Sequence, residues 1–454
     1  MPDAPFGQSF VPGSFEYFSY DEVLYDELER RVFLHYSLHS KDEVVPFVET
    51  VTLPSVIKKR PHQALLRLLW LVAGLSYFKM AAPSEIRFPQ GVRRAERVYL
   101  ASLIRGGLGE FAFVNSMETA LTPTIVGPHL EDSSEPHQGD DWSGEHEPLV
   151  PVGGGKDSVA SIVTLQRAGI TPILFSVNRY PAIDRCVAVA GEQYVWASRA
   201  LDPAVNGLNA RGALNGHIPV TAINSAIALI VADGAGFGSV VMSNEESANH
   251  GNVLWRGFEI NHQWSKSLDA EVGLRAYLAG SDLQEDRYFS LLRPLNEFTI
   301  ARLFAESPEY LDAFTSCNRA FSLDVGRRSE SWCGECPKCE FVFLILAPWV
   351  PKDRLVGVFG ANLLGDADRL TGYRALLGLG EQKPFECVGG FDEAAAALLI
   401  AAARPEWAGD VVVEAVAPEL AAVGRMLGAE AEDGVLWSGI PERFREAIRA
   451  RVLR

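Results

Sequence analysis

The chain has 454 residues, enough for two or three domains, and its 48% hydrophobic and 22% charged residues are ordinary for a globular protein. Its formal net charge of −17, from 41 basic and 58 acidic residues, argues against a surface that neutralises nucleic-acid phosphates. The longest apolar stretch, Leu68 to Tyr77, is shorter than the roughly 18 residues that a membrane span needs. The first residues lack the pattern of a signal peptide. We therefore expect a cytoplasmic protein with no nucleic-acid or membrane partner.

Residues 1–120 predict an N-terminal α+β lobe. Two helices are expected in it, a strongly apolar one from Pro61 to about Met80 and a second from Val92 to Arg105. Before them, residues 15–20, 31–36 and 44–53 are rich in β-formers and alternate between apolar and polar side chains. This pattern predicts three strands of a small antiparallel sheet. No recognisable chemistry lies in this lobe.

Residues 121–147 predict a mobile linker, because proline, glycine, serine and acidic residues dominate there. The linker contains His129, His137 and His146. These could be metal ligands, but a solvated acidic loop is the favoured interpretation.

Residues 148–350 alternate strand-like and helix-like segments. The expected strands begin at Pro148, Thr171 and Gly238, and the expected helices run to Arg167 and then cover 190–199 and 221–233. This alternation predicts an α/β fold with a doubly wound parallel sheet, whose ligands bind at the carboxyl ends of the strands. Three strand ends carry polar residues that should line one crevice: 153–158, 176–178 and 243–246.

The most informative strand end is the loop Gly153-Gly-Gly-Lys-Asp-Ser158. Glycines let a phosphate approach the backbone closely, and the first turn of a helix offers it unpaired N–H groups. Lys156 adds positive charge, Ser158 adds a donor, and Asp157 is a potential Mg²⁺ ligand. A Walker A loop would need glycine at Val150 and a hydroxyl residue in place of Asp157, so this is a different phosphate site. A glycine-rich surface turn is the alternative, and the flanking strand and helix disfavour it.

The loop resembles the S-G-G-x-D-S signature of the PP-loop ATP pyrophosphatases, with Gly153 where that family has serine. The resemblance implies an adenine-nucleotide alpha-hydrolase-like fold, ATP cleavage between the α and β phosphates, and transfer of AMP to the substrate. We expect ATP to be bound by Gly153, Gly154, Gly155, Lys156, Asp157, Ser158, Ser176 and Asn178, with Mg²⁺ on Asp157.

The third strand end opens an unusually polar stretch, residues 243–271, which combines histidines, carboxylates, amides and a lysine. A solvated loop is the alternative interpretation. Its position beside the expected ATP crevice favours a role in binding or proton transfer. We name Lys266, His262, His250 and Glu246 as candidate catalytic residues. Candidate substrate-binding residues are Asn244, Glu245, Asn249 and Asn261, together with His217 and Thr221 from the segment before an apolar helix.

The segments GGGKDS, NGHIPVT, SNEESANHGN and NHQWSKS, with KPFECVGG at 383–390, together resemble the UDP-N-acetylmuramoyl-L-alanyl-L-glutamate epimerase family. The resemblance covers most of the chain. It implies consumption of ATP and Mg²⁺, release of AMP and pyrophosphate, and inversion of the terminal L-Glu of a UDP-linked muramoyl dipeptide, a peptidoglycan precursor. Cys387 lies in the last of these segments and is a candidate substrate-binding residue, with a catalytic role as the less favoured interpretation.

Four cysteines, Cys317, Cys333, Cys336 and Cys339, have the spacing C-x15-C-x2-C-x2-C. Thiolates with this spacing predict a tetrahedral Zn²⁺ site. An iron–sulfur cluster, a persulfide relay and a metal-free cluster remain alternatives.

Residues 351–454 predict a mostly helical C-terminal region, with helices at 393–403 and 417–427 and one strand-like segment at 410–413. Two other functions stay open. One is a PP-loop enzyme that amidates or transfers sulfur to a deazaguanine nucleobase precursor or tRNA, because a similar clustered-cysteine zinc site occurs in the nitrile synthase of queuosine biosynthesis. The other is a nucleotide-sensing module without turnover, which the polar stretch disfavours.

Overall fold

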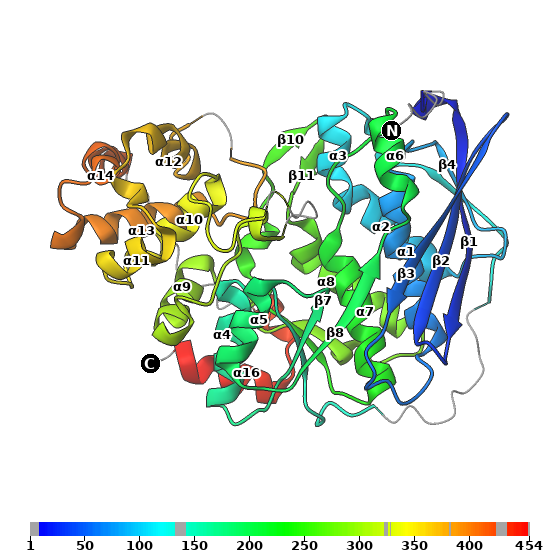
Figure 1. The fold of residues 1–454 in the computed structure, drawn as a ribbon, viewed down its shortest axis with the longest axis horizontal. Coiled ribbons are helices and arrows are strands. Elements are labelled where there is room, and N and C mark those ends of the chain that lie inside the picture. Colours follow the sequence, from blue (N-terminus) through cyan, green and yellow to red (C-terminus); the bar gives the residue numbers. More distant parts are fainter. Residues whose placement is uncertain are drawn as a thin grey trace.

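The computed structural model describes residues 9–131, 142–321, 326, 328–380, 383–423 and 434–452. A ten-stranded sheet runs through these residues in the order β12-β9-β6-β7-β8-β3-β2-β1-β4-β5 (Figure 1). None of the helices described is both long and apolar enough to cross a membrane.

One half of the sheet is parallel and doubly wound. Its strands are β6 (Leu149–Pro151), β7 (Ile173–Val177), β8 (Tyr194–Ala200), β9 (Val240–Met242) and β12 (Tyr288–Ser290). The chain starts in the middle at β6, adds β7 and β8 on one side, and then adds β9 and β12 on the other. The predicted α/β class and doubly wound parallel sheet are therefore confirmed, and the strand order reverses beside β6, where such sheets bind ligands.

Helices cover both faces of this half because successive strand residues point in opposite directions. Leu149 and Val240 pack against one core, while Val150 and Val241, the next residues, pack against the other. The connecting helices are α4 (Lys156–Arg167), α5 (Pro181–Ala190), α6 (Ala204–Ala210), α7 (Val220–Ala235), α8 (Leu268–Ala279) and α9 (Glu297–Ala305).

The other half comprises the predicted antiparallel strands β1 (Phe15–Asp26), β2 (Arg31–Ser40) and β3 (Val44–Thr52), which are confirmed. The short strands β4 (Glu85–Arg87) and β5 (Thr124–Val126) extend its edge. Helices α1 (Gln63–Phe78) and α2 (Arg94–Gly107) confirm the two predicted helices, and α3 (Gly109–Val114) follows them. Strand β5 shows that part of the expected linker is structured; residues 132–141, including His137, lie outside the described residues.

The two halves meet where β3 pairs with β8, through residues 50–52 and 198–200. Arg199 on β8 donates hydrogen bonds from Nε to Glu49 Oε1 on β3 at 2.6 Å and from its terminal nitrogen to Ser76 Oγ on α1 at 3.0 Å. Tyr77 of α1 also donates to Glu49, at 2.9 Å. The sheet and this buried ion pair thus join residues 9–120 to the parallel half instead of leaving them as a detached lobe.

The described C-terminal residues are helical, as expected. The helices are α10 (Pro337–Leu346), α11 (Lys352–Phe359), α12 (Leu370–Leu376), α13 (Phe391–Ala402), α14 (Val411–Val423), α15 (Gly434–Ser438) and α16 (Glu442–Val452). Helix α16 returns to the parallel half and packs on α4 (Figure 1). Residues 424–427 of the predicted helix 417–427 lie outside the described residues.

Two predicted elements were wrong. Residues 191–199 of the predicted helix 190–199 are not helical: Gly191 ends α5 in a left-handed conformation with φ 70°, and the alternating segment Tyr194–Ala200 forms β8. Residues 411–413 are not a strand, because the valines begin α14, where Val412, Val416 and Leu420 recur every four residues on its buried face.

Candidate functional site

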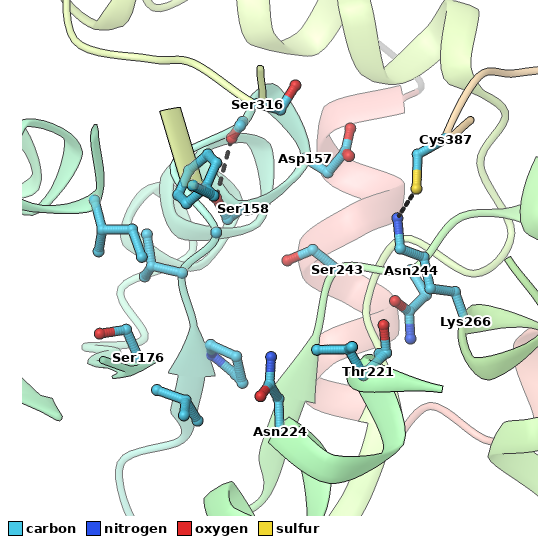
Figure 2. A pocket seen from close by; sticks show the side chains of 18 of the residues that line it. Asp157, Ser158, Ser176, Thr221, Asn224, Ser243, Asn244, Lys266, Ser316 and Cys387 are labelled. Carbon is cyan, nitrogen blue, oxygen red and sulfur yellow. Dashed lines mark hydrogen bonds between the residues drawn. The ribbon is translucent and has the colours of Figure 1, made fainter. Parts of the chain in front are cut away.

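A cavity of about 630 Å³ lies beside the point where the strand order reverses. The carboxyl ends of β6, β7 and β9 contribute to it, together with α7, α10 and the segment that contains Cys387. Figure 2 shows side chains from these elements pointing into the open space. The three polar strand ends found in the sequence therefore line one cavity.

The glycine loop runs directly from β6 into α4. Gly154 has φ 76°, and a Cβ there would lie 3.3 Å from backbone atoms of Ala182 and Thr315, so glycine suits both the conformation and the space. A Cβ on Gly153 would have nothing within 4 Å. Except for Gly154, all the loop residues named as ATP ligands line the cavity: Gly153, Gly155, Lys156, Asp157 and Ser158.

Lys156 is buried and pairs with the carboxylates of Asp157 and Glu297. Burial alone would lower the pKa of Lys156, but the two carboxylates raise it, so the side chain stays cationic. Burial raises the pKa of Glu297 to about 8, against the opposing effect of Lys156. This charged cluster lies where the helix α4 begins.

The next strand end is preorganised by hydrogen bonds. Ser176 Oγ donates to the carbonyl of Asn178 at 2.7 Å, and Asn178, with φ 62°, accepts the backbone N–H of Arg199 at 3.0 Å. On β9's end, the buried Ser243 Oγ has no hydrogen-bond partner among the described residues. A buried hydroxyl without a partner in a cavity wall suits a polar ligand.

A second cluster of titratable groups adjoins the cavity at Lys266 and Cys387. Lys266, in the short 3₁₀ helix Trp264–Lys266, places Nζ 3.5 Å from Cys387 Sγ, the contact dashed in Figure 2. His262 hydrogen-bonds Cys387, and its Nδ1 lies 2.5 Å from Glu110 Oε2 on α3. The ring of His217 packs at a tilt against the ring of His262, with 4.5 Å between the ring centroids. Cysteine, imidazolium and carboxylate thus form a chain of contacts that ends at the cavity.

The electrostatics of this cluster favour a thiolate. Burial raises the pKa of Cys387, but Lys266, Lys338 and the hydrogen bond from His262 outweigh it and lower the value to about 5. Burial lowers the pKa of His262, while its hydrogen bonds to Cys387 and Glu110 raise it to about 9. At neutral pH the pair is therefore thiolate and imidazolium.

Of the other sequence-predicted residues, some line the cavity, and the rest lie elsewhere or have local partners. Thr221 and Asn244 line the cavity. His250 is largely exposed, with Nε2 3.1 Å from Glu246, and neither residue lines the cavity. Asn249 accepts the backbone N–H of Leu268 at 2.7 Å, and Asn261 donates to the carbonyl of Ala248 at 2.8 Å. Glu245 is buried next to Asn244, and burial raises its pKa.

The sequence analysis missed several residues of the site. Glu110 and Glu297 stand alone in helices distant along the chain, and no local motif marks either one. Lys338 lies between two cysteines of the cluster, so the sequence indicates only a spacer between metal ligands. In the structure its side chain lines the cavity. Only contact in three dimensions identifies these residues.

The four cysteines converge beside the first turn of α10. Sγ of Cys333 lies 3.6 Å and Sγ of Cys336 lies 3.7 Å from Sγ of Cys339, and the sulfurs of Cys317, Cys333 and Cys339 lie within 4.8 Å of one another. Four sulfurs held tetrahedrally at a Zn–S distance of about 2.3 Å would be about 3.8 Å apart. The donor set and spacing therefore fit zinc.

Two family models match the chain: one described as the MurL N-terminal domain matches residues 9–291, and one described as the MurL C-terminal domain matches residues 313–431. The first spans the β3–β8 junction, and the boundary between the two models falls between residues 291 and 313. No solved structure matches the chain.

Curated relatives agree with the family models. A Micromonospora protein is 44% identical over 388 residues, which cover 84% of this chain and 86% of the relative. Proteins of Salinispora tropica and Xanthomonas oryzae pv. oryzae are 42% and 40% identical, covering 88% and 83% of this chain and 88% and 84% of theirs. All three are named UDP-N-acetyl-alpha-D-muramoyl-L-alanyl-L-glutamate epimerase. With both family models and these relatives covering most of its length, the chain belongs to the MurL family of epimerases.

Proposed function

We propose that this enzyme inverts the terminal L-Glu of UDP-MurNAc-L-Ala-L-Glu to D-Glu, with ATP cleaved to AMP and pyrophosphate. The observation that carries the proposal is one cavity whose wall includes a phosphate-type loop together with Lys266 and Cys387 of the thiolate–imidazolium–lysine cluster. The names of the relatives supply the substrate. A place in peptidoglycan precursor synthesis inside the cytoplasm follows from that substrate.

Activation is needed because a free carboxylate resists loss of the neighbouring α-proton, which would place a second negative charge beside the first. A carboxylate oxygen attacks the α-phosphorus of ATP, the α–β bond breaks, and pyrophosphate leaves. The resulting mixed anhydride with AMP has no carboxylate charge, so the α-proton becomes more acidic. After inversion, water attacks the acyl carbon, AMP leaves, and the carboxylate is restored.

The glycine loop provides the ATP site in this proposal, and we infer a PP-loop type of phosphate binding from its GGGKDS sequence. Gly153, Gly155 and the first turn of α4 would contact the outer phosphates, with Lys156 adding positive charge. Asp157 is the carboxylate suited to hold Mg²⁺, an ion that prefers oxygen ligands and bridges phosphates. Ser176, Asn178 and Ser243, whose Oγ has no partner in the described part of the chain, would serve the nucleotide or the substrate.

Inversion requires a base on one face of the α-carbon and a proton source on the other. Among the residues named from the sequence, Lys266 and Cys387 line the cavity, and His262 contacts Cys387. Thr221 and Asn244 offer polar contacts to the dipeptide. His250 and Glu246 have no place in this proposal, because they do not line the cavity.

The four cysteines would hold a structural Zn²⁺ that ties the loop after Cys317 to α10. None of these four cysteines lines the cavity, although Lys338 between them does. This placement favours a structural role over the sulfur transfer of the alternative PP-loop enzyme.

The direct test is incubation with ATP, Mg²⁺ and UDP-MurNAc-L-Ala-L-Glu, followed by chiral analysis of the glutamate and assay of pyrophosphate. We expect D-Glu and dipeptide-dependent pyrophosphate release. Asp157→Asn should slow pyrophosphate release by about 10²–10³-fold, the usual loss for one well-placed electrostatic contact. Asp184→Asn, which alters an exposed carboxylate paired with Arg179, is the matched control. Pyrophosphate release at the wild-type rate in Asp157→Asn would contradict the assignment of the loop.

A further inference from the structure

We propose that Cys387 is the base that removes the α-proton of the activated glutamyl residue, and that Glu110 is a positioning residue that acts on it through His262. This proposal rests on the function proposed above and deepens it. A catalytic role for Cys387 was the less favoured interpretation of the sequence, and Glu110 was not named there.

The geometry places the thiol where a base is needed. Cys387 lies in the wall of the cavity that the glycine loop also lines, with Lys266 Nζ 3.5 Å from its sulfur. The carboxylate of Glu110 holds Nδ1 of His262 at 2.5 Å, which leaves the other ring nitrogen to donate to the sulfur. Glu110 thereby fixes both the ring orientation and the charge of His262, as the carboxylate does in a Cys–His–carboxylate arrangement.

Charges from several elements act on the sulfur. On the positive side are Lys266 before α8, Lys338 in α10, His262 before the 3₁₀ helix, and Lys383 on the same segment as Cys387. Burial lowers the pKa of His217 to about 4, so its ring is neutral at physiological pH and adds no positive charge. The carboxylates Asp157, Glu245 and Glu297 act on Lys266. The balance stabilises the thiolate.

The neighbouring groups cannot accept the proton at neutral pH. Burial lowers the pKa of Lys266, but Cys387 and Glu245 raise it above its ordinary value, so the amine is already protonated. His262 is also protonated, with a pKa of about 9. Cys387 is the member of the cluster that is deprotonated and faces the cavity, and it is therefore the group able to act as a base.

Removal of the α-proton breaks the Cα–H bond and forms an S–H bond on Cys387. The electron pair of the broken bond moves onto the acyl oxygen of the activated carboxyl group. Water on the opposite face of the α-carbon then donates a proton and becomes hydroxide, which completes the inversion. The thiol proton neutralises the hydroxide and restores the thiolate.

The first test measures the thiol without substrate. Full-length protein is alkylated with iodoacetamide across pH 4–10, and the labelled peptide of Cys387 is quantified by mass spectrometry. We expect half-maximal labelling near pH 5 and a shift upward by at least one pH unit in Glu110→Gln. Glu118→Gln, a change in an exposed carboxylate paired with Arg256, should leave the midpoint unchanged. A wild-type midpoint near the ordinary thiol value of about 8.5 would overturn the proposal.

The second test separates activation from proton transfer. Cys387→Ala, or Cys387→Ser if the alanine variant fails to fold, is incubated with ATP, Mg²⁺ and the dipeptide substrate in D₂O. Pyrophosphate release should stay within about tenfold of wild type. Formation of D-Glu and deuterium at the α-carbon should fall by about 10²–10⁴-fold, the usual contribution of a general base.

The outcomes distinguish the two proposals. Wild-type protein that released no pyrophosphate would overturn the proposed function, and the base assignment with it. Wild-type turnover together with undiminished α-deuterium incorporation in Cys387→Ala would overturn the base assignment alone. A glutamyl adduct on Cys387, found by mass spectrometry of quenched turnover, would also overturn it by making the sulfur a nucleophile.

Discussion

At the scale of single residues, the site depends on charge neighbours that outweigh burial. Cys387 and Lys266 are each in a setting that disfavours their charged form, yet each stays charged because the other lies 3.5 Å away. For Glu297, the attraction of Lys156 does not offset the effect of burial, so the pKa of this carboxyl group rises to about 8. Such different pKa shifts among groups that line one cavity are typical of functional sites.

The pH dependence of epimerisation tests this electrostatic picture. The active form has Cys387 deprotonated and His262 protonated, so kcat/KM should rise as pH increases through about 5 and fall as pH increases through about 9. Lys266→Met removes a cation beside the sulfur and should move the lower limb upward. Rates of D-Glu formation between pH 4 and 10 provide the measurement. A single rise centred near 8.5 would contradict the thiolate assignment.

At the scale of elements, the cysteine cluster connects a loop, a helix and the cavity. Cys317 lies in the loop that backs onto the glycine loop, where Thr315 N–H donates to the carbonyl of Gly154 at 2.8 Å. Cys336 caps α10, and Lys338 in the first turn of that helix reaches the cavity. A metal bound here would hold two walls of the site in place without contacting the substrate.

We expect about one zinc per chain, measured by elemental analysis of the purified protein. Cys336→Ser should lose the metal and lower the melting temperature by at least about 5 °C, because binding of a structural metal contributes to folding. Cys186→Ser, a change in a buried cysteine outside the cluster, should keep the zinc. Iron and a brown colour in the wild-type protein would instead show an iron–sulfur cluster.

At the scale of the whole molecule, the continuous sheet makes residues 9–120 part of the structure that carries the cavity. Strand β8 pairs with β7 on one side and with β3 on the other, and its Arg199 both contacts Glu49 and lines the cavity. The buried ion pair is therefore positioned to couple the stability of the N-terminal half to the shape of the site.

Glu49→Ala should lower the free energy of unfolding by about 3–5 kcal/mol, because Arg199 would keep a buried charge without its partner. Glu29→Ala removes a solvent-exposed pair with Arg31 and should cost less than about 1 kcal/mol. Urea unfolding followed by circular dichroism gives both values. If the N-terminal half unfolded in a separate transition, the two halves would not be coupled through this junction.

The sequence by itself determined what depends on neighbouring residues. The glycine loop needs only a strand, three glycines and a helix start, and the cysteine cluster has its spacing within one short segment plus Cys317. Strand and helix alternation was enough for the doubly wound class, and the antiparallel strands β1–β3 followed from their period of two. Where local signals competed, as at 190–199 and 410–413, packing decided the outcome and the sequence prediction was wrong.

Only the tertiary structure decided which groups meet. Glu110 and His262 are 152 positions apart in sequence, Lys266 and Cys387 are 121 apart, and Lys156 and Glu297 are 141 apart. The charge states of His262, Lys266, Cys387, Lys156 and Glu297 depend on burial and on nearby charges, and neither is encoded in a local pattern. The same holds for the sheet, because the β3–β8 pairing that joins its halves links residues about 150 positions apart. Local motifs thus predicted a phosphate site, while only long-range contacts set the electrostatic surroundings of Cys387.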